Sequence, residues 1–183
     1  EAYSRPRQNG VNAITIKEGD QLLEAVLTSG HSEVIIAAKN GKAIRFNEEV
    51  VRPIGRTGAG VKGITIDDDD EVVGMICVEK DVKEDILVVS ENGYGKRTDL
   101  DDYRITNRGG KGVKTLQITE KTGKLIAIKS VTDENDLMII NKSGLTIRIP
   151  VGDIRLAGRA TQGGRVSNLR NNDAIASFVP VPK

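Results

Sequence analysis

The sequence is poor in the residues that build disulfides, metal sites and aromatic cores. Its 183 residues include one cysteine, one histidine, no tryptophan and only five aromatic residues. A single cysteine excludes a disulfide within the chain, and Cys77, in an apolar stretch, is interpreted as a buried thiol. No apolar run reaches the roughly 20 residues that a membrane-spanning helix needs, and no secretory signal is recognisable. We therefore expect a cytoplasmic protein with an aliphatic core.

Motifs for catalysis and cofactor binding are equally scarce. Residues 58–63 read Gly-Ala-Gly-Val-Lys-Gly, the spacing of a dinucleotide-binding loop, but the helix that this motif requires does not follow. His31 has no second histidine or cysteine to complete a metal site, and residues 67–70 lack the ligand pattern of a calcium loop. No nucleophile with its base can be assembled around one histidine. We predict no catalytic, metal or cofactor site in this chain.

The sequence does contain one unit that repeats about every fifty residues. The pattern Arg-x3-Arg-x3-Gly occurs at 52–60, 104–112 and 155–163, at intervals of 52 and 51 residues, and we name these segments the first, second and third arginine loops. Such periods are typical of repeat architectures, in which equivalent residues of successive units lie on the same rim. The predicted boundaries are a partial unit 1–19, a first unit 20–69, a second unit 70–124, a third unit 125–174 and a partial unit 175–183.

Each unit is expected to contain four β-strands. The strongest signal is a hairpin, because Asn40-Gly41, Asn92-Gly93 and Ser143-Gly144 stand between apolar runs where a two-residue turn needs positive φ. The hairpin strands are predicted at 34–39, 43–46, 86–91, 137–142 and 145–149. A first strand is predicted at 22–28, 72–78, 125–131 and 175–181, and a fourth strand at 10–16, 60–66, 112–118 and 163–169. This pattern indicates an all-β, propeller-like pinwheel of which the chain holds about three to four blades.

Charge is balanced in total but uneven along the chain. Of 27 basic and 26 acidic residues, the segments 39–62, 94–114 and 142–170 hold 18 basic and 6 acidic ones. These segments contain the arginine loops, so we expect a basic outer edge, with acidic turns such as 67–70 on another face. Evenly spaced guanidinium groups suit the phosphates of double-stranded nucleic acid. The alternative is solubilising charge on exposed loops, which repetition in register makes less attractive.

The candidate DNA-binding residues are the six loop arginines and the basic residues that flank them. Arginine binds phosphate with two parallel hydrogen bonds, and the loop glycines are expected to bring backbone N–H groups close to a phosphate. Few aromatic residues interrupt these loops, so we expect recognition of the duplex backbone with little dependence on sequence. The full set is Arg45, Arg52, Arg56, Lys62, Lys96, Arg97, Arg104, Arg108, Lys111, Lys114, Arg148, Arg155, Arg159 and Arg165.

Three stretches carry a resemblance to a known family. Residues 55–64 read Gly-Arg-Thr-Gly-Ala-Gly-Val-Lys-Gly-Ile, residues 91–98 read Glu-Asn-Gly-Tyr-Gly-Lys-Arg-Thr, and residues 158–163 read Gly-Arg-Ala-Thr-Gln-Gly. With them the chain resembles, over essentially its whole length, the β-pinwheel C-terminal domain of the bacterial DNA gyrase A proteins. Residues 106–112 resemble the family's seven-residue box, matching its last five positions at 108–112 but not its first two. The resemblance implies a disc whose basic edge wraps duplex DNA and so supports ATP-driven negative supercoiling by a type IIA topoisomerase.

The resemblance also implies partners and a division of labour. The implied partners are double-stranded DNA, the rest of the gyrase A protein and the gyrase B protein, in the bacterial cytoplasm on the chromosome and away from membranes. The catalytic tyrosine, ATP and Mg²⁺ belong to other domains, so this fragment is not an enzyme by itself, and Tyr3, Tyr94 and Tyr103 are not proposed as nucleophiles. Two alternatives stay open: the corresponding protein of topoisomerase IV, whose C-terminal domain selects DNA crossings, and a propeller that binds an acidic protein. The repeated arginine pairs favour gyrase.

Overall fold

The computed structural model describes residues 1–5, 7–79 and 81–183. A short 3-10 helix follows each hairpin: η1 (Glu48–Val50), η2 (Leu100–Asp102) and η3 (Val151–Asp153). None of the helices in these residues is long and apolar enough to cross a membrane. The strands are β1 (Glu33–Ala38), β2 (Lys42–Asn47), β3 (Val72–Val78), β4 (Asp85–Ser90), β5 (Tyr94–Asp99), β6 (Val113–Lys114), β7 (Leu125–Val131), β8 (Asn135–Asn141), β9 (Thr146–Pro150), β10 (Gly164–Arg165) and β11 (Ile175–Pro182).

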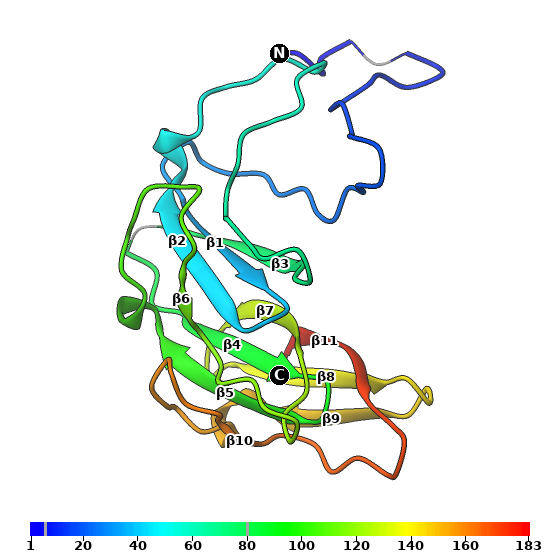
Figure 1. Ribbon diagram of the computed structural model, residues 1–183, viewed down its shortest axis with the longest axis vertical. Coiled ribbons are helices and arrows are strands. Elements are labelled where there is room, and N and C mark those ends of the chain that lie inside the picture. The colour runs from blue at the N-terminus through cyan, green and yellow to red at the C-terminus, as the bar shows by residue number, and fades with distance from the viewer. Residues whose placement is uncertain (6, 80) are drawn as a thin grey trace.

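The strands form three antiparallel sheets that follow one another around a curve (Figure 1). We name them the first sheet (β3-β1-β2-β6), the second sheet (β7-β4-β5-β10) and the third sheet (β11-β8-β9). In Figure 1 the strands β3, β7 and β11 lie on the inner side of the curve, and β6 and β10 lie on its outer side. The second and third arginine loops, which lead into β6 and β10, are therefore at the outer edge.

Each four-stranded sheet draws its strands from two successive units. In the first sheet the hairpin β1–β2 comes from the first unit, whereas β3 and β6 on its two sides come from the second unit. The second sheet repeats this arrangement one period later, with β7 and β10 of the third unit beside the hairpin β4–β5. The sequence period and the hydrogen-bonded sheet are thus different sets of residues, and every sheet links two units.

The core lies between the sheets and is mainly aliphatic. Strand β4 shows its organisation, because Ile86 and Val88 pack between the first and second sheets, whereas Leu87 and Val89 pack between the second and third. This follows from the alternation of side chains along a strand that is buried on both faces. Cys77 belongs to a smaller cluster on the far face of the first sheet and is only half-buried, so it is more exposed than predicted.

The predicted strands agree with the structure where a partner is present. The predictions at 72–78 and 125–131 coincide with β3 and β7. Those at 10–16, 22–28 and 60–66 are wrong, since the described residues there form no strand. Such segments pair with the hairpin of the preceding unit, and the described residues before β1 contain no hairpin. The fourth strands predicted at 112–118 and 163–169 shorten to the two-residue strands β6 and β10.

Candidate nucleic-acid interface

The second arginine of an arginine loop fastens its own unit to the preceding one. Arg108 donates from Nε to the carbonyl oxygen of Val50 at 3.3 Å and from Nη1 to that of Lys62 at 3.2 Å. Val50 ends η1, and Lys62 lies in the extended segment after the first arginine loop. The guanidinium group therefore spans two backbone segments of the first unit from a loop of the second unit.

The same two bonds recur one period later. Arg159 donates from Nε to the carbonyl oxygen of Asp102 at 3.0 Å and from Nη1 to that of Lys114 at 2.7 Å. Arg56 makes one comparable bond, at 3.4 Å, to the carbonyl oxygen of Asn12. These arginines are half-buried. We name the contact of Arg108 and Arg159 with the preceding unit the arginine clasp.

Two rows of exposed basic side chains accompany the clasps. Within residues 1–5, 7–79 and 81–183, the first arginine of each loop is exposed and has no side-chain hydrogen-bond or ion-pair partner. The second row lies ten residues further along each unit, beside or within the fourth-strand segment. The outer arginine row is Arg52, Arg104 and Arg155, and the fourth-strand row is Lys62, Lys114 and Arg165.

Each clasp joins the two backbone segments that carry one member of each row. Because Arg108 binds the carbonyl oxygen of Lys62 and that of Val50, two residues before Arg52, its guanidinium lies between the backbone segments that carry Arg52 and Lys62. A guanidinium has five N–H donors, and the clasp uses two of them. We name these three basic groups a junction cluster; the next one consists of Arg104, Lys114 and Arg159.

The structure corrects the prediction for Arg45, which lies in the interior. Its guanidinium forms an ion pair with Glu33, and its Nη1 donates to the carbonyl oxygens of Leu100 at 3.0 Å and Tyr103 at 2.8 Å. Only 9% of the residue is exposed. Arg45 is therefore committed to joining the first hairpin to the second unit and is not placed to meet a phosphate.

Arg97 and Arg148 repeat this cross-strand pairing in the next two hairpins. Arg97 pairs with Asp85 at 3.2 Å and Asp133 at 2.6 Å, and little of its side chain is exposed. Arg148 pairs with Asp136 at 2.7 Å but stays half exposed. Burial raises the pKa of Asp85, with Arg97 opposing the rise. The sequence held a signal for these pairs, since an acidic residue stands twelve positions before each of the three hairpin arginines.

Lys96 is the third predicted DNA-contacting residue that the structure places inside. It is 0% exposed, and its ammonium faces carbonyl oxygens of the third arginine loop. Burial lowers its pKa from 10.5 to about 8. Sequence alone does not separate it from an exposed lysine such as Lys111, because the loop that covers it lies more than sixty residues away.

Two of the loop glycines, Gly112 and Gly163, are required for packing against the preceding hairpin, whereas a Cβ at the equivalent Gly60 of the first loop would meet nothing within 4 Å. Gly112 has φ +76°, and a Cβ there would lie 2.5 Å from the carbonyl oxygen of Ala43 on β2. At the equivalent Gly163, with φ +77°, a Cβ would collide with the carbonyl oxygen of Gly95 on β5. Only glycine allows both the left-handed backbone and this close approach of β6 and β10 to the preceding hairpin.

Sequence reasoning missed two lysines of the basic edge. Lys42 on β2 is exposed and lies opposite Lys114 on β6 in the strand register. Lys121 places Nζ 5.4 Å from the centre of the Tyr94 ring, on which Arg165 also lies at 5.2 Å while donating to the Tyr94 hydroxyl at 2.8 Å. Burial would raise the pKa of Tyr94, but the hydrogen bond and charge of Arg165, with Lys121, lower it. The local potential is therefore positive.

The acidic turn at 67–70 is closer to the basic edge than we expected. Asp70 Oδ1 accepts from the backbone N–H of Asn40 at 2.9 Å, which holds the turn against the first hairpin. Asp67 and Asp70 line the same hollow as Lys42 and Lys111. The predicted segregation of acidic turns to another face is therefore wrong for this turn.

Comparison with known proteins settles the family. Over residues 1–29, 32–79, 84–132 and 135–182 the chain matches the family described as DNA gyrase C-terminal domain, beta-propeller. The chain belongs to this family. It is 46% identical over 179 residues to the DNA gyrase A protein of Staphylococcus aureus strain MRSA252. The aligned region covers 98% of this chain and 20% of that protein. The chain thus spans about a fifth of the length of the curated relatives it matches.

Solved C-terminal domains of DNA gyrase A and of DNA topoisomerase IV have the same fold. A DNA gyrase A C-terminal domain superposes with a TM-score of 0.85 at 27% identity, covering 94% of this chain and 58% of that one. A DNA topoisomerase IV C-terminal domain superposes with a TM-score of 0.91 at 26% identity, covering 99% of this chain and 56% of that one. The predicted family and the all-β, propeller-like fold are confirmed.

The segment 106–112, which resembles the family's seven-residue box, is hydrogen-bonded to the first unit along its length. The backbone N–H of Thr106 donates to the carbonyl oxygen of Arg45 at 2.8 Å, and that of Gly109 donates to Gly63 at 2.6 Å. The clasp of Arg108 lies between these bonds. The segment therefore holds two units together while Lys111 at its end stays exposed.

Proposed function

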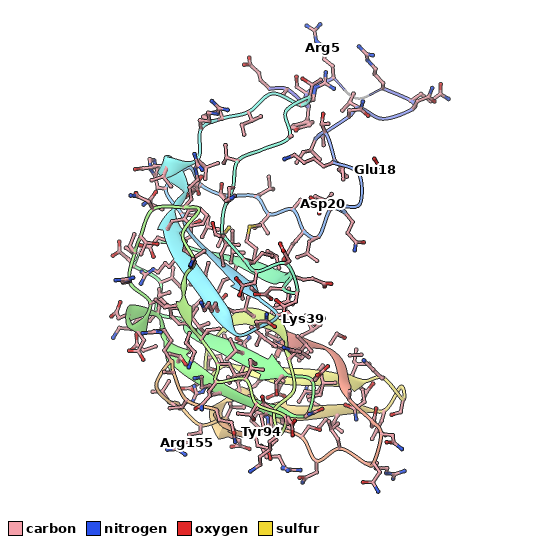
Figure 2. The ribbon with its side chains drawn as sticks, viewed as in Figure 1. Arg5, Glu18, Asp20, Lys39, Tyr94 and Arg155 are labelled. Atoms are coloured by element: carbon pink, nitrogen blue, oxygen red, sulfur yellow. The ribbon has the colours of Figure 1, made fainter. Side chains whose placement is uncertain are left out.

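We propose that the outer edge binds duplex DNA by its phosphates and leads it along the curve of the sheets. The observation that carries this proposal is the junction cluster, in which a clasped guanidinium lies between two backbone segments that each carry an exposed basic residue, and which recurs with the period of the chain. Figure 2 shows Arg155 and Tyr94, the partner of Arg165, at the outer edge, whereas Lys39 lies on the inner side. Recurring contacts are what a bent duplex needs, because bending 20 to 30 base pairs costs on the order of 1–6 kcal/mol.

Binding of this kind depends on backbone contacts and not on base contacts. Phosphates carry no sequence information directly. The side chains at the junction clusters are lysine and arginine, and Tyr94, which lies beside Arg165 of the fourth-strand row, is buried and engaged by that arginine. Neither a reader of base edges nor a stacking platform for single strands is supported by these residues.

Within a complete enzyme, the proposed role of this domain is to wrap DNA in support of negative supercoiling by a gyrase-type type IIA topoisomerase. Its partners would be duplex DNA, the rest of the gyrase A protein and the gyrase B protein, in the bacterial cytoplasm on the chromosome. Strand cleavage and the use of ATP and Mg²⁺ are assigned to other domains, and no catalytic role is assigned to this chain. The 46% identity to a gyrase A protein supports this assignment.

The proposal is tested by the salt dependence of binding to a labelled duplex. Seven of the basic residues predicted to contact DNA are exposed at the outer edge without an ion-pair partner among the described residues, and each phosphate contact contributes about −0.9 to the slope of log K against log salt. The slope should therefore be roughly −6. Lys83→Ala is the matched control for the loss of one exposed charge and should leave the slope unchanged, because Lys83 is exposed but lies outside the three basic segments. A slope near that of a single contact would contradict the proposal. The seven residues are Arg52, Lys62, Arg104, Lys111, Lys114, Arg155 and Arg165.

A second candidate function is crossing selection of the topoisomerase IV type, which the TM-score of 0.91 to that C-terminal domain favours. The two functions differ in what they do to DNA topology. Nicked circular DNA sealed by ligase while the protein is bound should show a shifted linking number if the duplex is wrapped. Binding without such a shift would favour the crossing selector.

A further inference from the structure

A buried lysine supports the third arginine loop from below. The Nζ of Lys96 lies 2.7 Å from the carbonyl oxygen of Gly158, 2.6 Å from that of Arg159 and 2.8 Å from that of Thr161. The Thr161 hydroxyl oxygen is 3.2 Å away. A buried ammonium is costly unless its three N–H donors are satisfied, and these carbonyl groups satisfy them. They all belong to the loop that carries Arg155 and Arg159.

The preceding sheet has no such support at the same place. Ile44 of β2 is one period before Lys96, and the hollow beneath the second arginine loop, of about 250 Å³, is lined by Ile44, Asn107 and Gly110 among others. Asn107 and Gly110 correspond to Gly158 and Thr161. The first sheet forms with an apolar residue at this position, so the ammonium is not a general requirement of the fold. It acts on one loop.

We propose that Lys96 is a positioning residue that holds the loop 155–163 in the conformation in which Arg155 stands exposed at the outer edge. This rests on the proposed function of that edge. A loop ordered before binding loses less conformational entropy when DNA arrives, so affinity is higher. Lys96 itself touches no DNA. Its contribution reaches the phosphate through Arg155, and removing Lys96 should matter only as long as Arg155 is present.

The test is a double-mutant cycle at pH 7, read as the dissociation constant for a labelled duplex at fixed salt. Lys96→Met keeps the length of the side chain and removes the charge. It should weaken binding by roughly tenfold, because about one or two side chains of the loop would then have to be ordered when DNA binds. Arg155→Ala should cost clearly less in the Lys96→Met background than in the unchanged chain. Arg104→Ala, in the loop above Ile44, should cost the same in both backgrounds. Lys96→Arg, which retains the charge and donors, should restore most of the affinity.

The outcomes separate this proposal from the one it rests on. Equal cost of Arg155→Ala with and without Lys96 would overturn the positioning role. If neither Arg155→Ala nor Arg104→Ala changes binding in the unchanged chain, the DNA-binding proposal itself fails. Lys96→Ile, which places the residue of the first sheet in the second, serves if Lys96→Met does not fold. Failure of all three Lys96 variants to fold would show that the lysine is required for the fold and would also overturn the role.

Discussion

Removal of the outer arginines should weaken DNA binding, whereas removal of the clasp arginines should lower the stability of the fold. Arg104→Ala with Arg155→Ala removes two exposed charges whose side chains make no internal bond, so the slope of log K against log salt should become less steep by about 1.8. The midpoint of thermal unfolding should hardly change, because exposed loop charges contribute little to stability.

Arg108→Ala with Arg159→Ala instead breaks four bonds between units. A partly exposed bond of this kind contributes on the order of 0.5 kcal/mol net, which gives a loss of about 2 kcal/mol for the pair of substitutions. For a chain of this size that loss lowers the melting temperature by about 4–8 °C.

Circular dichroism melting and fluorescence anisotropy on the same samples measure both quantities. The reasoning is refuted if the two double variants shift the melting temperature equally, because the clasp would then stabilise the fold no more than the exposed arginines do. It is also refuted if removing the outer arginines leaves the salt slope unchanged.

The same geometry gives three further expectations. The unfolded chain keeps the Lys96 proton up to about pH 10.5, whereas the folded chain, in which burial and Arg159 lower this pKa against the charge of Asp102, loses it near pH 8. The free energy of unfolding should therefore rise with pH between about 8 and 10.5, and Lys96→Met should abolish that rise in urea titrations. Gly112→Ala should lower the melting temperature clearly more than Gly144→Ala, because both have positive φ but only Gly112 would collide with a carbonyl oxygen; equal shifts in calorimetry would contradict this. Unrelated duplexes of equal length should compete for binding within about 100-fold of each other, whereas specific readers of sequence differ by roughly 10³ or more.

The sequence was informative wherever a structure depends on neighbouring residues. The hairpin at Asn40-Gly41 was predicted because turn and strands are contiguous, and the period placed the arginine loops in register. The partners of the fourth strands were not predictable in this way, since the pairing of Val113 with Ala43 joins two units. Periodicity fixes the spacing of strands but not which hairpin receives them.

The candidate site was predicted in composition and only partly in arrangement. All fourteen basic residues were visible in the sequence, but burial divides them, and burial depends on distant segments. Arg52 and Arg56 look alike in a loop of nine residues, yet Arg52 is exposed, whereas Arg56 donates to a carbonyl oxygen. The acidic residue twelve positions before each of Arg45, Arg97 and Arg148 is a clue that the sequence offered, because cross-strand pairs have a fixed spacing in a hairpin.

Because each unit supplies the strands that flank the preceding hairpin, residues can be deleted from or added to the chain in whole periods. Excision of residues 70–124 would take β3 and β6 away from the first hairpin together with the hairpin β4–β5. The strands β7 and β10, which hold the equivalent places one period later, could then close on the hairpin β1–β2. A shorter cut would leave a hairpin with one flank bare. Lengthening or shortening such a protein by complete periods therefore keeps every type of contact between successive units. The length of the outer edge can change in this way while the fold stays the same.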